Sequence, residues 1–243
     1  MIYFQEQDLE HRCLMKEIRM NLRLDKYLAN SRAGSRSEVK EYIRKGRVTV
    51  NGTVCRDNSR YIEETDEVCL DGRRIVYKEH VYYMLNKPAG VVSATEDPVE
   101  RTVIDLFPPE LRKSLFPVGR LDKDSVGLLI ITDDGEFAHR FTSPSGHVDK
   151  RYLIRTDQPL CVEDAKKFSE GITLADGTTL KSAKLEISEN DPCQAEVTIS
   201  EGKYHQIKRM IASCGKTVTC LKRLSMGDIT LDPDLEEGEF KEL

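Results

Sequence analysis

Residues 119–131 constrain the fold more than any other segment of this chain, because a polar turn leads there directly into an apolar run. The run Leu128–Ile131 is bounded by turn residues and has the length and composition of a buried β-strand. The turn before it carries Asp122 two residues after Arg120, with glycines at positions 119 and 127 that tolerate unusual backbone angles. A carboxylate held near a basic residue at the mouth of a sheet is a typical position for a catalytic group. A surface turn rich in Asp and Lys is the alternative interpretation.

The composition is that of a soluble globular chain. Of the 243 residues, 33% are charged and the formal net charge is −5. No apolar run is long enough for a transmembrane helix, and the acidic N-terminus lacks the apolar core of a signal peptide. Seven cysteines without a CxxC pair and five histidines without metal-ligand spacing predict free thiols in a reducing, cytoplasmic compartment and no metal site.

Basic residues are concentrated near the N-terminus. Between Arg19 and Arg60 the chain holds eleven Lys and Arg residues and only four Asp and Glu residues. This excess of seven positive charges stands in a chain whose net charge is −5, so the remainder is strongly acidic. A basic head on an acidic body predicts a polyanion-binding module joined to a second domain.

The head has the pattern of two short helices followed by a hairpin. The apolar residues with helical spacing are Leu24, Tyr27 and Leu28 in the first helix and Val39, Tyr42 and Ile43 in the second. Ser35 and Glu38 form a capping box that begins the second helix, and Gly46 is placed to end it. Asn51-Gly52 between two β-branched pairs predicts a hairpin with a type I′ turn.

A cationic stripe runs along the second helix. Arg36, Lys40 and Arg44 are four residues apart and therefore share one face. A solvated charged face is the alternative, but no acidic residue is interleaved on that face. With the neighbouring Lys45 and Arg47, these residues are the predicted polyanion contacts of the head.

The head resembles the alpha-L RNA-binding motif, which is shared by a small-subunit ribosomal protein, tyrosyl-tRNA synthetases and several RNA-modifying enzymes. The resemblance covers about residues 22–74, and its matching segments are 23–28, 35–38, 43–48 and 50–52. It implies that the cationic helix and the hairpin grip structured RNA through phosphates, without reading sequence.

A polar, charged segment, 71–79, predicts the boundary between the head, assigned to residues 20–75, and a larger domain of residues 80–243. In that domain strands are predicted at 81–86, 91–93, 128–132, 150–155, 183–187, 195–199 and 217–221, and helices at 136–141, 163–170 and 204–213, with a short helix inside 98–109. This irregular order predicts an α+β domain with a mixed, mostly antiparallel sheet. Residues 1–19 are expected to form an extension, disordered or a frayed helix, with Met20 as the natural start.

The C-terminal domain resembles the pseudouridine synthases, specifically the RsuA type that modifies ribosomal RNA. The matching motifs are Leu85-Asn86-Lys87-Pro88-Ala89-Gly90, Pro117 to Asp122 with Thr132 to Gly135, Lys150-Arg151-Tyr152, Glu201 to Met210, Leu221-Lys222-Arg223, Gly227 and the stretch 231–243. Gly215-Lys216-Thr217 looks like the end of a phosphate-binding loop, but the glycine that such a loop needs is Met210 here. With the head, the resemblance runs from about Leu22 to the C-terminus.

The resemblance implies a cofactor-free isomerisation at Asp122. The N1–C1′ bond of a uridine breaks, the base rotates, and C5 is joined to C1′. Asp122 acts either as the nucleophile or as the base that removes a ribose proton, and the sequence leaves both roles open. A shielded carboxylate needs a fixed cation beside it, for which Lys208 is the candidate; a solvent-facing helix lysine is the alternative.

The resemblance also implies a base pocket and a set of RNA contacts. Tyr152 stacks on the base and handles a late proton, unless it is only a core tyrosine, and Leu221 forms the pocket floor, unless it is a plain core leucine. Arg120 fills the space vacated by the flipped base or holds the RNA backbone, although it could equally brace the turn against Asp124. The remaining expected phosphate contacts of the active-site face are Lys87, Lys150, Lys203 and Arg209.

The expected function is therefore the conversion of one uridine to pseudouridine in small-subunit ribosomal RNA, by a monomer acting on an assembly particle, with no membrane partner. An enzyme of the same family that acts on large-subunit RNA is the alternative within the class. The loops 93–109 and 143–149 are expected to decide between these two targets. A catalytically silent RNA-binding assembly factor is the alternative from another class. A glycosidase that uses Asp122 and Asp124 is disfavoured, because two carboxylates in one turn cannot flank a bond.

Overall fold

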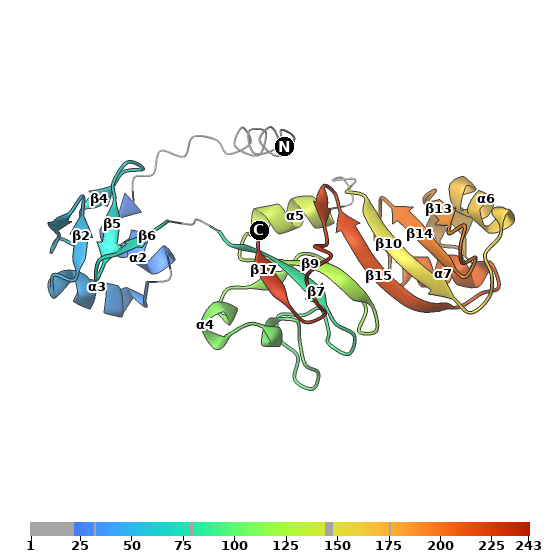
Figure 1. Cartoon of the computed structure of the whole chain (residues 1–243), viewed down its shortest axis with the longest axis horizontal. Helices are drawn as coiled ribbons and strands as arrows, with labels where there is room; N and C mark the ends of the chain where they lie inside the picture. Colours follow the sequence, from blue (N-terminus) through green and yellow to red (C-terminus); the bar gives the residue numbers. More distant parts are fainter. Residues whose placement is uncertain (1–21, 32, 78–79, 144–147, 175) are drawn as a thin grey trace. The chain divides into compact units, whose positions relative to one another are not determined.

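The structure is a computed structural model that describes residues 22–31, 33–77, 80–143, 148–174 and 176–243. The chain divides into two compact units, residues 1–79 and 80–243 (Figure 1). The expectations for residues 1–19 and for Met20 lie outside the described residues.

The N-terminal unit packs two helices on a small antiparallel sheet. Its elements are β1 (Leu22–Arg23), α2 (Leu24–Asn30), α3 (Arg36–Arg44), β2 (Val48–Val50), β3 (Thr53–Val54), β4 (Tyr61–Ile62), β5 (Val68–Leu70) and β6 (Arg73–Ile75). The strand order is β3-β2-β5-β6, and β1 pairs separately with β4. The helices bury Leu24, Leu28, Val39 and Ile43 against the sheet, which gives this unit its own core.

Local signals account for most of this unit. The Ser35 hydroxyl accepts a hydrogen bond from the Glu38 N–H at 3.3 Å, and the Glu38 carboxylate accepts one from the Ser35 N–H at 2.8 Å, as the capping box predicts. Asn51 and Gly52 have φ angles of 54° and 76°, so the predicted hairpin turn is confirmed. Tyr42, expected in the core, packs against it but is only half-buried, and the Arg47 guanidinium lies over its ring.

The expected boundary segment begins too early. Asp71 and Gly72 form a second tight turn, with φ angles of 51° and 76°, that joins β5 to β6. Strand β6, residues 73–75, therefore belongs to the sheet of the N-terminal unit. A polar sequence concealed this edge strand, because an exposed edge does not need an apolar face.

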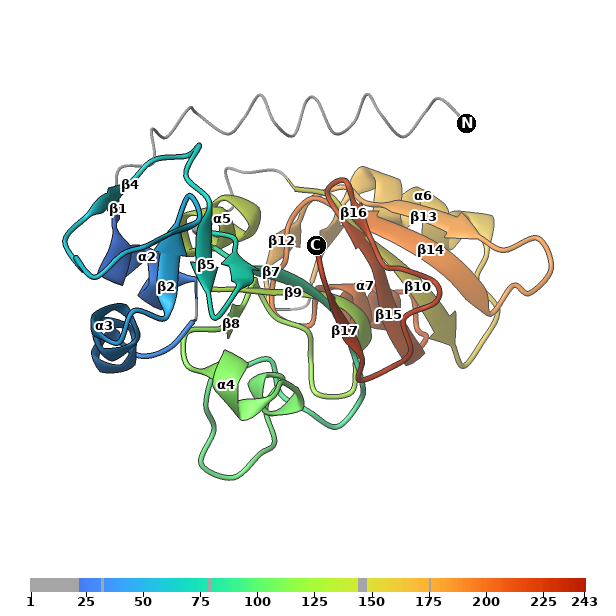
Figure 2. The ribbon, with the colours of Figure 1, turned by 60° about the vertical axis from the view of Figure 1, so that its left-hand side comes forward.

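The second unit is built on one nine-stranded sheet. Its strands are β7 (Tyr82–Lys87), β8 (Phe116–Pro117), β9 (Val126–Thr132), β10 (Lys150–Thr156), β11 (Ile172–Thr173), β12 (Thr179–Leu180), β13 (Lys184–Ile187), β14 (Gln194–Ile199), β15 (Val218–Met226), β16 (Ile229–Thr230) and β17 (Phe240–Glu242), of which β11 and β12 form a separate pair. Its helices are the 3₁₀ helix η1 (Ile104–Leu106), α4 (Pro109–Arg112), α5 (Gly135–Thr142), α6 (Val162–Glu170) and α7 (Gln206–Ser213). Figures 1 and 2 show α6 beside β13, at one end of this sheet.

The sheet is mixed and mostly antiparallel, so the predicted fold class is confirmed. Along the order β13-β14-β10-β15-β9-β7-β17, the only parallel pair among the described strands is β15 with β9. This pair is close-packed: Gly127 has a φ of +99°, and a Cβ there would lie 2.4 Å from the Arg223 carbonyl oxygen. Glycine at 127 thus lets β15 approach the strand that follows the Asp122 turn.

Several predicted elements differ in extent. Residues 91–93 were expected as a strand but contribute only an isolated bridge between Val92 and Thr102. Helix α7 begins at Gln206 rather than Tyr204, because His205 has left-handed backbone angles. Strand β15 runs five residues beyond its predicted end, to Met226, through pairing with β10 and β9. Within the described residues, no helix is long and apolar enough to cross a membrane.

Candidate active site

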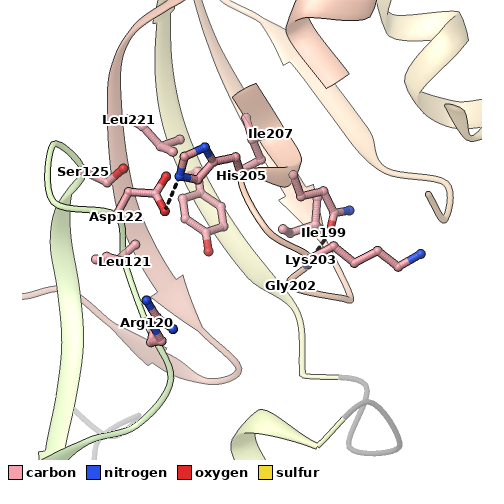
Figure 3. Close-up of a pocket in the computed structure, with 12 residues that line it drawn as sticks. Arg120, Leu121, Asp122, Ser125, Ile199, Gly202, Lys203, His205, Ile207 and Leu221 are labelled. Carbon is pink, nitrogen blue, oxygen red and sulfur yellow. Dashed lines mark hydrogen bonds and ion pairs between the residues drawn. The ribbon is translucent and has the colours of Figure 1, made fainter. Parts of the chain in front are cut away.

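Asp122 lies in a small pocket at the junction of β9, β15 and the segment before α7. The pocket has a volume of about 80 Å³. Its lining combines polar residues with an apolar wall: Arg120, Leu121, Asp122, Ser125, Tyr152, Ile199, Gly202, Lys203, His205, Gln206, Ile207 and Leu221. Four segments that are far apart in the sequence, at 120–125, 152, 199–207 and 221, thus meet around one pocket (Figure 3).

The Asp122 carboxylate is held by two side chains. Lys208 Nζ lies 3.0 Å from Oδ2, and His205 Nε2 lies 3.4 Å from Oδ1. The side chain of Asp122 is 29% exposed, so it is shielded without being sealed off from the pocket. The sequence prediction that Lys208 lies beside Asp122 agrees with this geometry.

Lys208 is fixed by a second carboxylate. Its ammonium also donates a hydrogen bond to Asp124 Oδ1 at 2.6 Å, so it bridges both acids of the turn. Partial burial lowers the pKa of Lys208, but its contacts with Asp124 and Asp122 outweigh this effect and raise the pKa above its ordinary value. The lysine is therefore a permanent cation, and the alternative of a solvent-facing helix lysine is wrong.

His205 was not recognised as a site residue from the sequence. Its backbone is left-handed, with φ 48° and ψ 34°, and its ring stacks on that of Tyr204 with centroids 3.8 Å apart. In Figure 3 the imidazole points directly at Asp122. The available signal was its position three residues before Lys208, where one helical turn brings both side chains to the same end of α7.

An apolar wall adjoins the carboxylate. Tyr152 on β10 and Leu221 on β15 are both buried and line the pocket together with Ile199 and Ile207. The registers of β10 with β14 and β15 bring these side chains to one face of the sheet. Both also belong to the core cluster, so each is a core residue that also lines the pocket, and their contact with a base stays a prediction.

Lys87 corrects a prediction, because it cannot contact a phosphate. Its side chain is 0% exposed, and its ammonium donates to the carbonyl oxygens of Ser125 at 2.8 Å, Pro88 at 3.1 Å and Lys123 at 3.4 Å. Burial lowers its pKa to about 8, against a smaller opposing effect from the carboxylates of Asp124 and Asp122. The residue ties the end of β7 to the turn that carries Asp122.

Lys150 also lies away from the pocket. Its ammonium donates to the Val148 carbonyl oxygen at 2.8 Å, and burial together with the nearby Arg223 lowers its pKa. Arg223 is itself buried and donates to the Leu128 carbonyl oxygen at 2.7 Å. Lys150 is half-buried and does not line the pocket, and its expected phosphate contact on the active-site face stays a prediction.

The other expected RNA contacts of the active-site face differ in whether their charged groups already have a partner in the protein. Arg209 forms an ion pair with Asp176, and the Lys203 ammonium donates to the Thr179 carbonyl oxygen at 2.6 Å while pointing away from Asp122 (Figure 3). Arg120 lines the pocket and is exposed. In the described part of the chain its guanidinium has no hydrogen bond or ion pair, so the alternative of a brace against Asp124 is wrong.

The five basic residues predicted on the head are all exposed. Arg47 is paired with Asp71, and Lys45 forms an ion pair with Glu41 at 2.7 Å. Arg36, Lys40 and Arg44, by contrast, have no ion pair with any described residue. The stripe along α3 is therefore an unneutralised cationic surface.

The described residues contain no cluster of three or more His, Cys, Asp or Glu side chains that could hold a metal ion. Their six cysteines, at 55, 69, 161, 193, 214 and 220, are free thiols.

Comparisons with known proteins agree with this geometry. Residues 81–213 match the RNA pseudouridylate synthase family, and residues 22–68 match the S4 domain. An uncharacterized RNA pseudouridine synthase of Bacillus subtilis, YtzG, is 46% identical over 91% of this chain and 95% of its own length. The ribosomal small subunit pseudouridine synthase A of Escherichia coli K12 is 40% identical over 91% of this chain and 96% of its own.

A solved structure supports the same assignment. The crystal structure of a pseudouridylate synthase, 40% identical in sequence, superposes with a TM-score of 0.65 and covers 91% of this chain and 96% of its own. The family model spans more than half of the present chain, and its range includes Asp122, Tyr152 and Lys208. The resemblance drawn from the sequence motifs is confirmed: the chain belongs to the RNA pseudouridine synthase family and carries an N-terminal S4 domain.

Proposed function

We propose that this protein converts one uridine of small-subunit ribosomal RNA into pseudouridine, with Asp122 as the essential carboxylate. The observation that carries the proposal is the Asp122–Lys208 ion pair at the mouth of an apolar pocket. The similarity to the E. coli protein named for the small subunit supports this choice of RNA. The reaction is an isomerisation: N1 gains a proton, C5 loses one, and the C1′ carbon exchanges N1 for C5.

The two oxygens of Asp122 have different tasks in this proposal. Oδ2 is held at 3.0 Å by Lys208, which Asp124 fixes from the other side, so this oxygen keeps its partner throughout. Oδ1 has only the longer contact with His205, at 3.4 Å. Oδ1 is therefore the atom presented to the nucleoside, either to attack it or to remove a ribose proton. Lys208 remains charged, so a cation faces Oδ2 while Oδ1 is presented to the nucleoside.

The uridine enters the pocket by leaving its stack in the folded RNA. Extruding a base costs a few kcal/mol, which the apolar wall and the backbone contacts must offset. Tyr152 stacks on the base and serves a late proton transfer, while Leu221 forms the floor. Arg120, free and exposed at the pocket rim, occupies the vacated space in the RNA or holds the strand.

In this proposal the head, residues 20–75, contributes affinity for the RNA, and the C-terminal domain, residues 80–243, catalyses the isomerisation. The unpaired cations Arg36, Lys40 and Arg44 bind phosphates of structured RNA, so this part of the affinity falls as salt rises. We further propose that the protein acts as a monomer in the cytoplasm, on a small-subunit assembly particle.

The test compares pseudouridine maps of ribosomal RNA from cells with and without the gene. One small-subunit position should lose its pseudouridine, and wild-type protein should restore it where Asp122→Asn does not. Loss of a large-subunit position instead would assign the protein to the other ribosomal RNA. Unchanged maps together with defective subunit assembly would identify a non-catalytic assembly factor.

A further inference from the structure

A second hollow adjoins the active-site pocket on the far side of Arg120. It is an open groove of about 420 Å³, within the size range of small-ligand sites, about 300–1,000 Å³. The loop 93–95, strand β8, the segment 119–120 and the outer face of α5 form it. The side chains in its lining that can form hydrogen bonds, ion pairs or stacking contacts with a ligand are Ser93, Thr95, Phe116, Arg120, His139 and Thr142.

The groove and the active-site pocket share one residue. Arg120 lines both, and its exposed guanidinium has no partner among the described residues. A chain that leaves the pocket on this side must pass an unpaired cation before it reaches the groove. This arrangement suits a phosphodiester linkage between two nucleotides.

The charge of the groove also suits a polyanion. The chain holds 42 acidic residues and has a formal net charge of −5, yet none of the described residues that line the groove carries a carboxylate. Its polar groups are hydroxyls, one imidazole and the Arg120 guanidinium, and Phe116 with Pro117 supplies an apolar wall. Hydroxyls and imidazole can bond a ribose or a phosphate, and an apolar wall can receive the face of a base.

The groove is fixed in position relative to Asp122. The Ser93 hydroxyl accepts a hydrogen bond from the Leu121 N–H at 3.0 Å and donates one to the Leu121 carbonyl oxygen at 2.8 Å. On the other wall, Gly119 has a φ of +75°, and a Cβ there would lie 3.4 Å from the Thr142 methyl group. Both walls are thus attached to the segment that carries Asp122, so the distance from groove to carboxylate is set by the fold.

We propose that this groove binds the nucleotide next to the target uridine on the same RNA strand, with Arg120 holding the phosphate between them. The inference rests on the proposed function and adds a sequence-reading subsite to it. The first residues of loop 93–109, a segment expected to separate small-subunit from large-subunit enzymes, form one wall of the groove. The groove therefore contributes to the choice of uridine.

The first experiment places a negative charge in the groove. Thr142→Glu is compared with Ser169→Glu, because both hydroxyls are exposed near the end of a helix and both bond back to a carbonyl of their own helix. The probe is an RNA fragment that carries the uridine mapped in the cellular experiment. We expect kcat/KM to fall about tenfold or more for Thr142→Glu, mainly through KM, and to change less than about twofold for Ser169→Glu.

The second experiment identifies the bound nucleotide. In the same fragment, each nucleotide flanking the uridine is replaced in turn by an abasic one. One replacement should lower kcat/KM of the wild-type protein about tenfold but that of Thr142→Glu less than about twofold. Equal activity of the two Glu variants, or equal sensitivity of wild type and Thr142→Glu at every position, would overturn the inference and leave the proposed function standing. A wild-type protein that forms no pseudouridine in any ribosomal RNA would overturn both.

Discussion

Two carboxylate–lysine pairs in the C-terminal unit differ in how completely the carboxylate is enclosed. Asp164, at the start of α6, is 4% exposed, and its Oδ2 accepts from Lys216 at 2.7 Å and from the Cys161 N–H at 2.9 Å. Asp122 is 29% exposed, and its carboxylate contacts only the side chains of Lys208 and His205 among the described residues. The first carboxylate caps a helix and braces the fold, whereas the second keeps one oxygen weakly held beside a pocket.

The contrast shows what distinguishes a reactive acid from a structural one. For Asp164, burial raises the pKa, but the contacts with Lys216 and with Cys161 outweigh it and lower the pKa to about 2. With only 4% of its side chain exposed, this carboxylate is enclosed by the fold and cannot meet a substrate. The Asp122 turn is instead held through its backbone, by the Lys87 ammonium, so the side chain itself remains available. An ion pair alone therefore does not mark a candidate site; the proposal for Asp122 rests on a partly exposed carboxylate with a pocket beside it.

The largest effect is expected for Asp122→Asn. The variant keeps the size of the side chain but removes the charge and the reactive oxygen, so kcat/KM should fall by at least about 10⁴-fold. Its melting temperature should change by less than about 4 °C, because no helix cap or buried backbone group depends on this side chain. Pseudouridine formation in the mapped RNA fragment and thermal unfolding measure the two quantities. If Asp122→Asn retained its activity, Asp122 would be no more reactive than Asp164, and the proposed difference between the two carboxylates would be wrong.

Substitution of Lys208 should mainly lower activity, whereas substitution of Lys216 should mainly lower stability. Lys208→Met removes the cation beside Asp122 and should lower kcat/KM by about 10²–10³-fold, similar to the loss of one preorganised donor. Lys216→Met leaves Asp164 buried without its cation and should lower the free energy of unfolding by about 3 kcal/mol, with activity within about threefold. Single-turnover kinetics and urea unfolding of both variants provide the measurements. A stability loss for Lys208→Met as large as that for Lys216→Met would assign the same bracing role to both pairs.

Asp164→Asn should show a pH-dependent loss of stability. The folded pKa of about 2 lies below the ordinary value of 3.8, so the ionised form stabilises the fold above about pH 5. At pH 7 the variant should be less stable than wild type by about 2 kcal/mol, and the difference should shrink as the pH falls from 5 towards 2. Urea unfolding at several pH values measures it. A difference that does not change with pH would mean that the charge of Asp164 contributes nothing.

The smallest effect is expected at His205. The change His205→Asn keeps a residue that tolerates left-handed backbone angles but is too short to reach Asp122. We expect kcat/KM to fall about tenfold, since one of the two contacts that orient the carboxylate is lost, with little change in the free energy of unfolding. A variant as active as wild type would show that Lys208 alone positions Asp122.

Local signals in the sequence predicted much of the fold, but they missed its shortest strands and predicted one strand that lacks a pairing partner. The capping box at Ser35 and the Asn51-Gly52 turn depend on neighbouring residues, and both are present as predicted. The short strands β8, β11, β12, β16 and β17 were not predicted, since two or three residues carry no periodicity. Residues 91–93 have the composition of a strand but find only one bridging partner.

The sequence by itself determined the family and the mixed α+β class, because the motifs that carry them are contiguous runs of the chain. It suggested Lys208 as the cation beside Asp122, and the tertiary structure brought the two together. The tertiary structure decided what each basic residue can touch. Lys87 is buried under the turn and Arg209 is neutralised by Asp176, while Arg120 is left free between two hollows. The reason is that the exposure and the partner of these charged side chains depend on segments far away in sequence. Those segments come together only when the strands on both sides of β9 have paired with it.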